Sequence, residues 1–397
     1  MDYNPALYEV IAHHITTSPK ELITFAQYMD LVLYHPQHGY YSNQEINIGK
    51  KGDFFTSVHL GADFGELLAE QFVQMWNILG NLQSFALVEM GAGQGYLALD
   101  ILKYIQQQHP HFYSCINYII VERSPALKEV QQRKLVGYPV NWQTLENMPS
   151  NSVTGCFFSN ELVDAMTVHR FHIIEGKLQE IYVTTKNMLQ DGGKDKFSQP
   201  LFAEVSGEPS TPKIREYFQL VNINVENYSE NYQSEVNLAV LEWLAIVSDR
   251  LQCGYILTID YGYPAHRYYN PMRSKGTLQC YWKHQRHNDP YINIGKQDIT
   301  AHVNFTALEK WGNYCGLTKL GFTQQGLFLM ALGLGNRLAS LSCGNQKISQ
   351  LLYRRDLLHQ LIDPMGLGGF GVLLQSKGLQ KSKISQTLRG FTTPDLS

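Results

Sequence analysis

The sequence predicts a Rossmann-like α/β fold, a doubly wound sheet with an N-terminal helical segment and an inserted substrate-side subdomain. Two observations support this prediction: strand-like and helix-like segments alternate from residue 85 onward, and a glycine-rich turn follows the first strand-like segment. Alternation of this kind is typical of a parallel sheet whose strands are joined by helices. The 397 residues, 44% hydrophobic and 17% charged, also have the composition of a globular chain.

The N-terminal helical segment is expected over residues 1–82, and the core of the sheet over residues 83–262. Residues 62–79 carry apolar side chains three and four positions apart, which indicates an amphipathic helix, and Gly80 is a suitable end for it. Ser124 and Pro125 form a typical helix start, with serine as the cap and proline in the first turn. The core strands are expected at 85–90, 117–122, 140–142, 154–159 and 254–260, and its helices at 96–107, from 124 onward and at 234–251.

The second half of the chain departs from simple alternation. Residues 165–233 are expected to be an insertion, with strand-like runs at 168–174 and 179–184 and then a polar segment rich in glycine and proline. Residues 263–379 should supply a polar, aromatic and basic segment near the site, followed by strands at 318–332 and 368–375 that complete the core. Residues 380–397 are expected to form a loose tail.

Charge and cysteine usage exclude several classes of partner and site. The formal net charge of -3 provides no strong field for nucleic acid or an anionic membrane. The six cysteines contain no C-x-x-C pair, so we expect reduced core residues, no structural zinc and no other metal site. The first residues lack the features of a secretory signal or transit peptide, and the longest apolar stretch, at 327–334, is too short to span a bilayer. These features predict a cytoplasmic protein with no membrane insertion.

The glycine-rich turn, Glu89-Met90-Gly91-Ala92-Gly93-Gln94-Gly95, is the strongest local signal. Glycines allow the backbone to turn sharply and to approach a ligand, which would lie over the carboxyl end of the first core strand. A dinucleotide fingerprint would require a third glycine at position 96, where this chain has tyrosine. The acid followed by G-x-G-x-G is similar to the first motif of class I methyltransferases, in which the loop contacts the methionine part of S-adenosylmethionine. A tight turn without a ligand is the alternative.

Glu122 ends the second core strand and can accept hydrogen bonds from both hydroxyls of a ribose. Nicotinamide enzymes use the same arrangement, so Glu122 indicates a nucleoside cofactor without identifying it. The alternative interpretation is an acid that caps a helix or simply faces solvent.

Two more acids follow the fourth strand, in Asn160-Glu161-Leu162-Val163-Asp164. Strand ends on this side of a parallel sheet form the ligand crevice. Glu161 and Asp164 are three residues apart, so one helical turn would place both on one side, where carboxylates can grip a planar guanidinium. The alternative is a helix start that Asn160 caps.

Together with weaker signals along the chain, these residues resemble the MidA-like methyltransferases, a bacterial and mitochondrial family associated with assembly of respiratory complex I. The resemblance runs in order from about residue 22 to 335, and it departs at Asn304, where an acid is expected, and at Leu162-Val163, where aromatic residues are common. The matching elements are Tyr34-His35-Pro36, His38-Gly39-Tyr40-Tyr41, Gly52-Asp53-Phe54, Thr56-Ser57, Phe64-Gly65-Glu66, Glu89 to Gly95, Asn160-Glu161, Asp164-Ala165, Asp260-Tyr261-Gly262, Gly276-Thr277-Leu278 and Asp298-Ile299-Thr300.

This resemblance implies a class I methyltransferase that uses S-adenosyl-L-methionine as its cofactor. It implies a protein-arginine N-methyltransferase whose protein substrate is a quinone-module subunit of complex I, and it leaves room for a homodimer. Residues expected to bind the cofactor are Glu89, Gly91, Ala92, Gly93, Gly95, Glu122 and Arg123. Catalytic roles are expected for Asn160, Glu161 and Asp164, and substrate binding for Asp53, Thr56, Asp260, Tyr261, His284 and Asp298.

Two other functions are compatible with parts of this pattern. A nicotinamide-dependent oxidoreductase would use the same sheet, although tyrosine in place of glycine at position 96 argues against this function. A non-catalytic assembly chaperone could retain a fold that binds S-adenosylmethionine, because a protein can bind this cofactor without catalysing methyl transfer.

Overall fold

The computed structural model describes residues 3–42, 56–185, 202–283, 285–341 and 348–393. These residues belong to two compact units that alternate along the chain. Unit 1 comprises Met1–Phe54, Asp164–Glu242 and Tyr263–Lys310, and unit 2 comprises Phe55–Val163, Trp243–Gly262 and Trp311–Ser397. The domain boundaries expected from the sequence remain a prediction, which this division into two units does not test.

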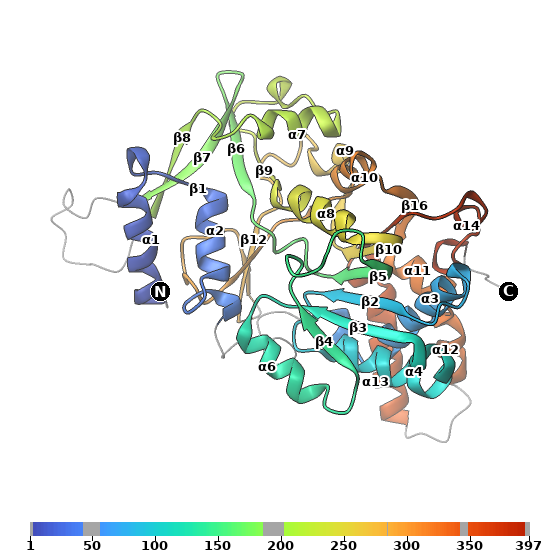
Figure 1. Cartoon of the computed structure of the whole chain (residues 1–397). Coiled ribbons are helices and arrows are strands. Elements are labelled where there is room, and N and C mark those ends of the chain that lie inside the picture. Colours follow the sequence, from blue (N-terminus) through green and yellow to red (C-terminus); the bar gives the residue numbers. More distant parts are fainter. Residues whose placement is uncertain (1–2, 43–55, 186–201, 284, 342–347, 394–397) are drawn as a thin grey trace. The chain divides into compact units, whose positions relative to one another are not determined.

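Unit 2 is built on a seven-stranded sheet in the order β16-β17-β10-β5-β2-β3-β4 (Figure 1). The strands from β10 to β4 are parallel, whereas β17 runs antiparallel to both of its neighbours. Strand β2 lies between β3 and β5, so the strand order reverses there. In open parallel sheets, ligands bind at the carboxyl ends of the strands at such a point. The strands are β2 (Phe85–Met90), β3 (Ile116–Val121), β4 (Val140–Gln143), β5 (Val153–Asn160), β10 (Leu251–Asp260), β16 (Thr318–Gln324) and β17 (Gly371–Lys377).

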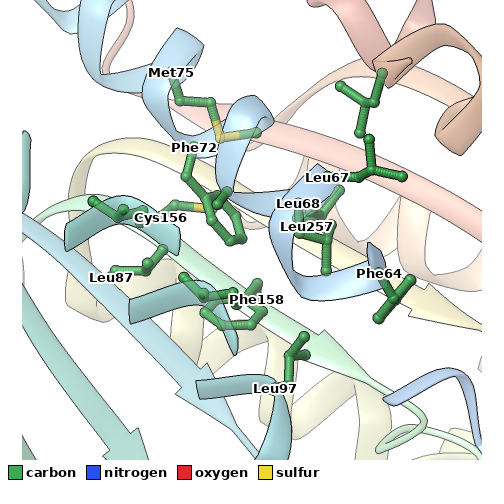
Figure 2. Close-up of a cluster of buried hydrophobic side chains, with 14 of the residues drawn as sticks. Phe64, Leu67, Leu68, Phe72, Met75, Leu87, Leu97, Cys156, Phe158 and Leu257 are labelled. Atoms are coloured by element: carbon green, nitrogen blue, oxygen red, sulfur yellow. The ribbon is translucent and has the colours of Figure 1, made fainter. Parts of the chain in front are cut away.

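Alternate residues of these strands form the main hydrophobic core of unit 2 on one face of the sheet. Leu87, Phe158 and Leu257 contribute from three neighbouring strands. Figure 2 shows Phe72 and Met75 of helix α3 (Asp63–Leu79) packing toward them. Residues of the opposite face, such as Val88 and Phe157, are also fully buried. Both faces are therefore covered, as a parallel sheet requires.

The other helical elements of unit 2 connect or cover these strands. Helix α4 (Tyr96–Gln108) follows β2, and α6 (Pro125–Lys134) follows β3. The remaining elements are α5 (Pro110–Cys115), α11 (Gln325–Leu332), α12 (Leu334–Ser340), α13 (Ile348–Ile362), α14 (Lys381–Ile384) and the 3-10 helices η3 (Ser57–His59), η6 (Leu367–Gly369) and η7 (Arg389–Phe391). Helices α8 (Ala239–Arg250) and α10 (Phe305–Tyr314) and strand β11 (Gly262–Tyr263) have residues in both units.

Unit 1 contains a five-stranded sheet in the order β1-β7-β6-β9, with β8 also paired to β7, and a smaller sheet in the order β13-β12-β14. Strands β6 and β7 pair antiparallel as a hairpin, and they correspond to the strand-like runs expected at 168–174 and 179–184. The strands are β1 (Ile23–Thr24), β6 (His169–Ile174), β7 (Lys177–Thr185), β8 (Phe202–Gly207), β9 (Gln233–Val236), β12 (Gln279–Trp282), β13 (Gln285–His287), β14 (Asp298–Thr300) and β15 (Val303–Asn304). The helical elements are α1 (Pro5–Thr17), α2 (Phe25–Tyr34), α7 (Lys213–Val221), α9 (Ala265–Tyr268), η1 (Pro19–Glu21), η2 (Tyr40–Ser42) and η4 (Val225–Asn227).

The Gly276-Thr277-Leu278 motif has a structural role inside unit 1. It surrounds the buried carboxylate of Glu235, which accepts hydrogen bonds from the Thr277 N–H at 2.9 Å and the Leu278 N–H at 3.2 Å. Gly276 adopts a φ of +71°, and a Cβ there would lie 2.2 Å from a Glu235 oxygen. Glycine is therefore required at this position because the chain folds around a buried acid.

Three elements expected from the sequence are wrong in part. The helix expected at 234–251 begins only at Ala239, because residues 233–236 pair with β6 as strand β9. The strand expected at 318–332 ends at Gln324, and helix α11 follows it. The tail expected to be loose contains α14 and η7, and Leu388 is 4% exposed because it packs into the core of unit 2.

Candidate functional site

The glycine loop lies at the carboxyl end of β2 and leads into α4. Gly91, Gly93 and Gly95 all have positive φ, at 73°, 51° and 78°. The Gly91 N–H donates to the carbonyl of Val121, and the Gly95 N–H donates to the carbonyl of Ala92, which is itself buried. A Cβ on Gly93 would meet no atom within 4 Å, so the backbone borders open space there. The loop thus offers a ligand close approach to the backbone at the N-terminus of a helix.

Glu122 directly follows β3, and its carboxylate accepts hydrogen bonds from neighbouring residues. Its Oε1 accepts a hydrogen bond from the Ser124 N–H at 2.8 Å, and its Oε2 accepts one from Nε2 of Gln131 at 3.0 Å. Burial raises the pKa of Glu122, whereas these hydrogen bonds lower it. A carboxylate offers about four lone-pair sites, so Glu122 can still accept a hydrogen bond from a ligand. Arg123, the next residue, is exposed.

The carboxyl end of β5 presents polar atoms toward the same edge of the sheet. Within the described ranges, Ser159 Oγ and Asn160 Oδ1 are buried and have no hydrogen-bond partner in the protein. Buried polar atoms are nearly always paired in native structures, so a pair of unsatisfied oxygens on adjacent residues indicates a missing ligand or water.

Glu161 has an unusual backbone conformation, with a φ of +51° in the left-handed region. Its carboxylate accepts hydrogen bonds from Nδ2 of Asn160 at 3.1 Å and from the Ser57 N–H at 3.4 Å. Burial, followed by the negative charge of Asp260, raises the pKa of Glu161 to about 8. A strained non-glycine residue with a perturbed pKa is a feature typical of functional sites.

Asp260 ends β10 beside β5 and is completely buried. Its Oδ2 accepts a hydrogen bond from the Val163 N–H at 2.9 Å, and its Oδ1 accepts one from the Tyr261 N–H at 2.8 Å. The first of these bonds fixes the residues that follow Glu161. The ring of Tyr261 packs against Phe370 at a centroid distance of 5.4 Å.

The segment before α3 also reaches this edge of the sheet. Thr56 caps η3, and its hydroxyl lies 2.8 Å from Nδ1 of His59. Ser57 follows it, and the contact of the Ser57 N–H with Glu161 places the start of η3 beside the end of β5. Thr56 therefore lies next to the residue that contacts Glu161, and its role in substrate binding stays a prediction.

Glu89 lies within β2, before the glycine loop, and is only 3% exposed. Its Oε2 accepts a hydrogen bond from the Tyr118 hydroxyl at 2.6 Å. Burial raises the pKa of Glu89 to about 7, and Glu122 contributes to the increase, whereas the bond from Tyr118 opposes it. The two acids beside the glycine loop therefore influence each other electrostatically.

Asp298, which was predicted to bind substrate, contacts Tyr41 within unit 1. The Tyr41 hydroxyl donates to Oδ1 of Asp298 at 2.8 Å, and its ring stacks on Tyr34 at 5.4 Å. Burial and the negative charges of Asp298 and Asp164 raise the pKa of Tyr41 well above its ordinary value. Asp298 thus contacts a tyrosine pair in unit 1, to which Asp164 also belongs, whereas Glu161 belongs to unit 2.

Asp53 and His284 were predicted to bind substrate and lie outside the described residues. The sequence analysis did not select Gln131, which contacts both the glycine loop and Glu122. A signal was available, because Leu127, Gln131 and Leu135 are four residues apart and a polar residue on the buried stripe of a helix is unusual.

The described residues contain no group of three or more histidine, cysteine, aspartate or glutamate side chains that could hold a metal ion. Among the helices formed by those residues, none has the length and apolar character needed to cross a membrane.

Comparison with known proteins gives consistent results. The S-adenosyl-L-methionine-dependent methyltransferase family matches residues 67–323. Protein arginine methyltransferase NDUFAF7 of Mus musculus, a mitochondrial protein, is 30% identical over 80% of this chain and 72% of its own length. Its homolog in Drosophila melanogaster, also mitochondrial, is 28% identical over 89% of this chain and 80% of its own length.

A candidate methyl transferase from Burkholderia thailandensis, crystallised with S-adenosyl-homocysteine, has a similar structure. It superimposes with a TM-score of 0.81 at 27% identity and covers 99% of this chain and 98% of its own. The similarity therefore extends over both units.

The mitochondrial relatives contradict the cytoplasmic location expected from the sequence, and that expectation is wrong. It rested on reduced cysteines and on the character of the first residues. Reduced thiols do not distinguish one reducing compartment from another.

Proposed function

The chain belongs to the S-adenosyl-L-methionine-dependent methyltransferase family, and on that basis we propose that it methylates an arginine side chain of a protein. The observation that carries the proposal is the turn after β5, where Glu161 is held in a left-handed conformation beside unsatisfied polar atoms. Relatives named protein arginine methyltransferase support the choice of acceptor. From the family resemblance we further propose that the substrate is a subunit of respiratory complex I.

The residues at the carboxyl ends of β2, β3 and β5 are suited to S-adenosylmethionine. The open space beside Gly93 leaves room for the methionine part against the backbone. Glu122 follows the neighbouring strand and can accept hydrogen bonds from ribose hydroxyls. The unpaired oxygens of Ser159 and Asn160 supply acceptors for donors of the cofactor or the acceptor group.

S-adenosylmethionine supplies a methyl group on a sulfonium, which leaves as a neutral thioether. The protein therefore has little leaving-group chemistry to perform and acts chiefly by alignment, which can lower a barrier by about 7–11 kcal/mol. In this proposal, Glu161 orients the guanidinium and offsets its charge while a proton leaves during or after transfer. A carboxylate is suited to this role because guanidinium presents a planar fork of donors and is not deprotonated beforehand.

The neighbours of Glu161 have supporting roles in this scheme. Asn160 donates to the Glu161 carboxylate, and Ser57 donates its N–H to the same oxygen, so both restrict its orientation. Asp260 holds the following turn through the Val163 N–H and is a positioning residue. We propose that Asp164 and Asp298, with the stacked pair Tyr34 and Tyr41, receive substrate within unit 1.

The test compares Glu161→Gln with the wild type, using tritiated S-adenosylmethionine and protein extract from cells that lack this chain. Wild type should label a protein, and mass spectrometry should find methylarginine in it. We expect Glu161→Gln to lower labelling more than about 100-fold, the scale of one general acid–base or orienting group. Its affinity for S-adenosyl-homocysteine should change less than threefold.

Glu129→Gln is the matched control, because Glu129 is an exposed glutamate in the same unit whose side chain is 61% exposed. It should label protein at the wild-type rate. Full turnover by Glu161→Gln would refute the assigned role. Tight cofactor binding by a wild type that never labels protein would favour an assembly chaperone instead.

A further inference from the structure

We infer that Gln131 is a positioning residue that fixes the ribose-binding carboxylate of Glu122 and ties it to the glycine loop. This inference rests on the proposed function, because it takes Glu122 as the residue that binds the ribose. It adds a residue that lies on neither ligand-binding loop and touches no reacting atom.

Gln131 lies on α6 and is completely buried. Its Nε2 donates to the carbonyl of Gly93 at 2.8 Å and to Oε2 of Glu122 at 3.0 Å. Its Oε1 accepts a hydrogen bond from Nε1 of Trp142, on the neighbouring strand β4, at 2.9 Å. One side chain therefore joins the glycine loop, the ribose acid and the edge of the sheet.

The partners determine which end of the amide faces which neighbour. A carbonyl and a carboxylate can only accept, and an indole N–H can only donate. Rotating the amide by half a turn would place its oxygen against two acceptors and its N–H groups against a donor. The orientation is thus unique, and both N–H groups of Gln131 are committed, one to each part of the cofactor site.

The Ser124 N–H holds Oε1 of Glu122 and Gln131 holds Oε2, so the orientation of the carboxylate is fixed. A carboxylate offers about four lone-pair sites, so Glu122 can still accept a hydrogen bond from the ribose. A Cβ on Gly95 would lie 3.4 Å from Cγ of Gln131, so the same side chain also packs against the loop. A carboxylate at position 131 would have no N–H group to donate to the Gly93 carbonyl or to Glu122, and its negative charge would repel Glu122.

The experiment measures binding of S-adenosyl-homocysteine and of its 2′,3′-dideoxy analogue by calorimetry. The variants are Gln131→Met, which keeps the shape and removes the amide, and Gln131→Glu, which keeps an acceptor for Trp142. Gln132→Met is the matched control, because Gln132 is the exposed neighbour on the same helix. Near-UV circular dichroism tests whether each variant is folded. If Gln131→Met is not folded, Gln131→Glu is used for the comparison instead.

Wild type should prefer the natural ligand over the dideoxy analogue by at least tenfold. Gln131→Met and Gln131→Glu should reduce this preference to less than threefold, mainly by weakening the natural ligand, and Gln132→Met should leave it unchanged. Equal weakening of both ligands would show a merely structural residue and overturn the inference, as would an unchanged preference. A wild type that binds neither ligand would overturn the proposed function as well.

Discussion

Substituting Gly93 by alanine should impair cofactor binding far more than it impairs folding. Gly93 has a φ of +51°, and a Cβ there would meet no protein atom within 4 Å. The folding cost is therefore only the left-handed backbone of an alanine, about 1–2 kcal/mol. The added methyl group would project into the space that we assign to the methionine part of the cofactor.

Gly80 provides a control with the same backbone cost. It ends α3 with a φ of +97°, and a Cβ there would also meet nothing within 4 Å. Gly80→Ala should therefore lower the free energy of unfolding by a similar amount, about 1–2 kcal/mol. Because Gly80 follows a helix that leads to the amino end of β2, its substitution should not affect cofactor binding.

The assay combines urea unfolding with calorimetric titration of S-adenosyl-homocysteine. Gly93→Ala should raise the Kd at least tenfold, which corresponds to about 1.4 kcal/mol, and Gly80→Ala should change it less than twofold. Equal Kd values for the two variants would refute the reasoning, because the loop would then border no ligand. A large loss of stability in Gly93→Ala alone would show that the space beside it is filled.

Three further predictions concern the turn after β5. The pKa of Glu161 is raised from 4.5 to about 8, so kcat/KM should rise with pH through about 8 as the carboxylate forms, and Glu161→Gln should abolish this step in the pH–rate profile. The raised pKa means that folding favours the protonated acid. The contribution of Glu161 to the free energy of unfolding is complete below about pH 4.5 and is lost as the pH rises through about 8. The free energy of unfolding of Glu161→Gln should therefore depend less on pH between about 4.5 and 8 than that of the wild type. Asp260→Asn removes one of two oxygens that accept backbone N–H groups, and it should lower the free energy of unfolding by about 1–3 kcal/mol and reduce kcat more than cofactor affinity. Unchanged kcat in a folded Asp260→Asn variant would show that the turn needs no such support.

The parallel core and the position of the glycine loop could be predicted from the sequence alone. Strand and helix periods are local properties, so Phe85–Met90 and Tyr96–Gln108 lie where the pattern of apolar residues predicts them. Glycines at 91, 93 and 95 have positive φ because an L-residue with a side chain is disfavoured there. Local pattern was insufficient at 318–332, where an apolar run without clear period contains a strand and then a helix.

The contacts that hold the polar side chains of the candidate site depend on the packing of elements that are distant in sequence. Glu161 receives its raised pKa from burial and from Asp260, which is distant in sequence and lies on the neighbouring strand β10. The contacts of Gln131 with the glycine loop and with Glu122 depend on how α6 packs against that loop. Pairings between residues far apart in sequence depend on packing in three dimensions, and no local period encodes them.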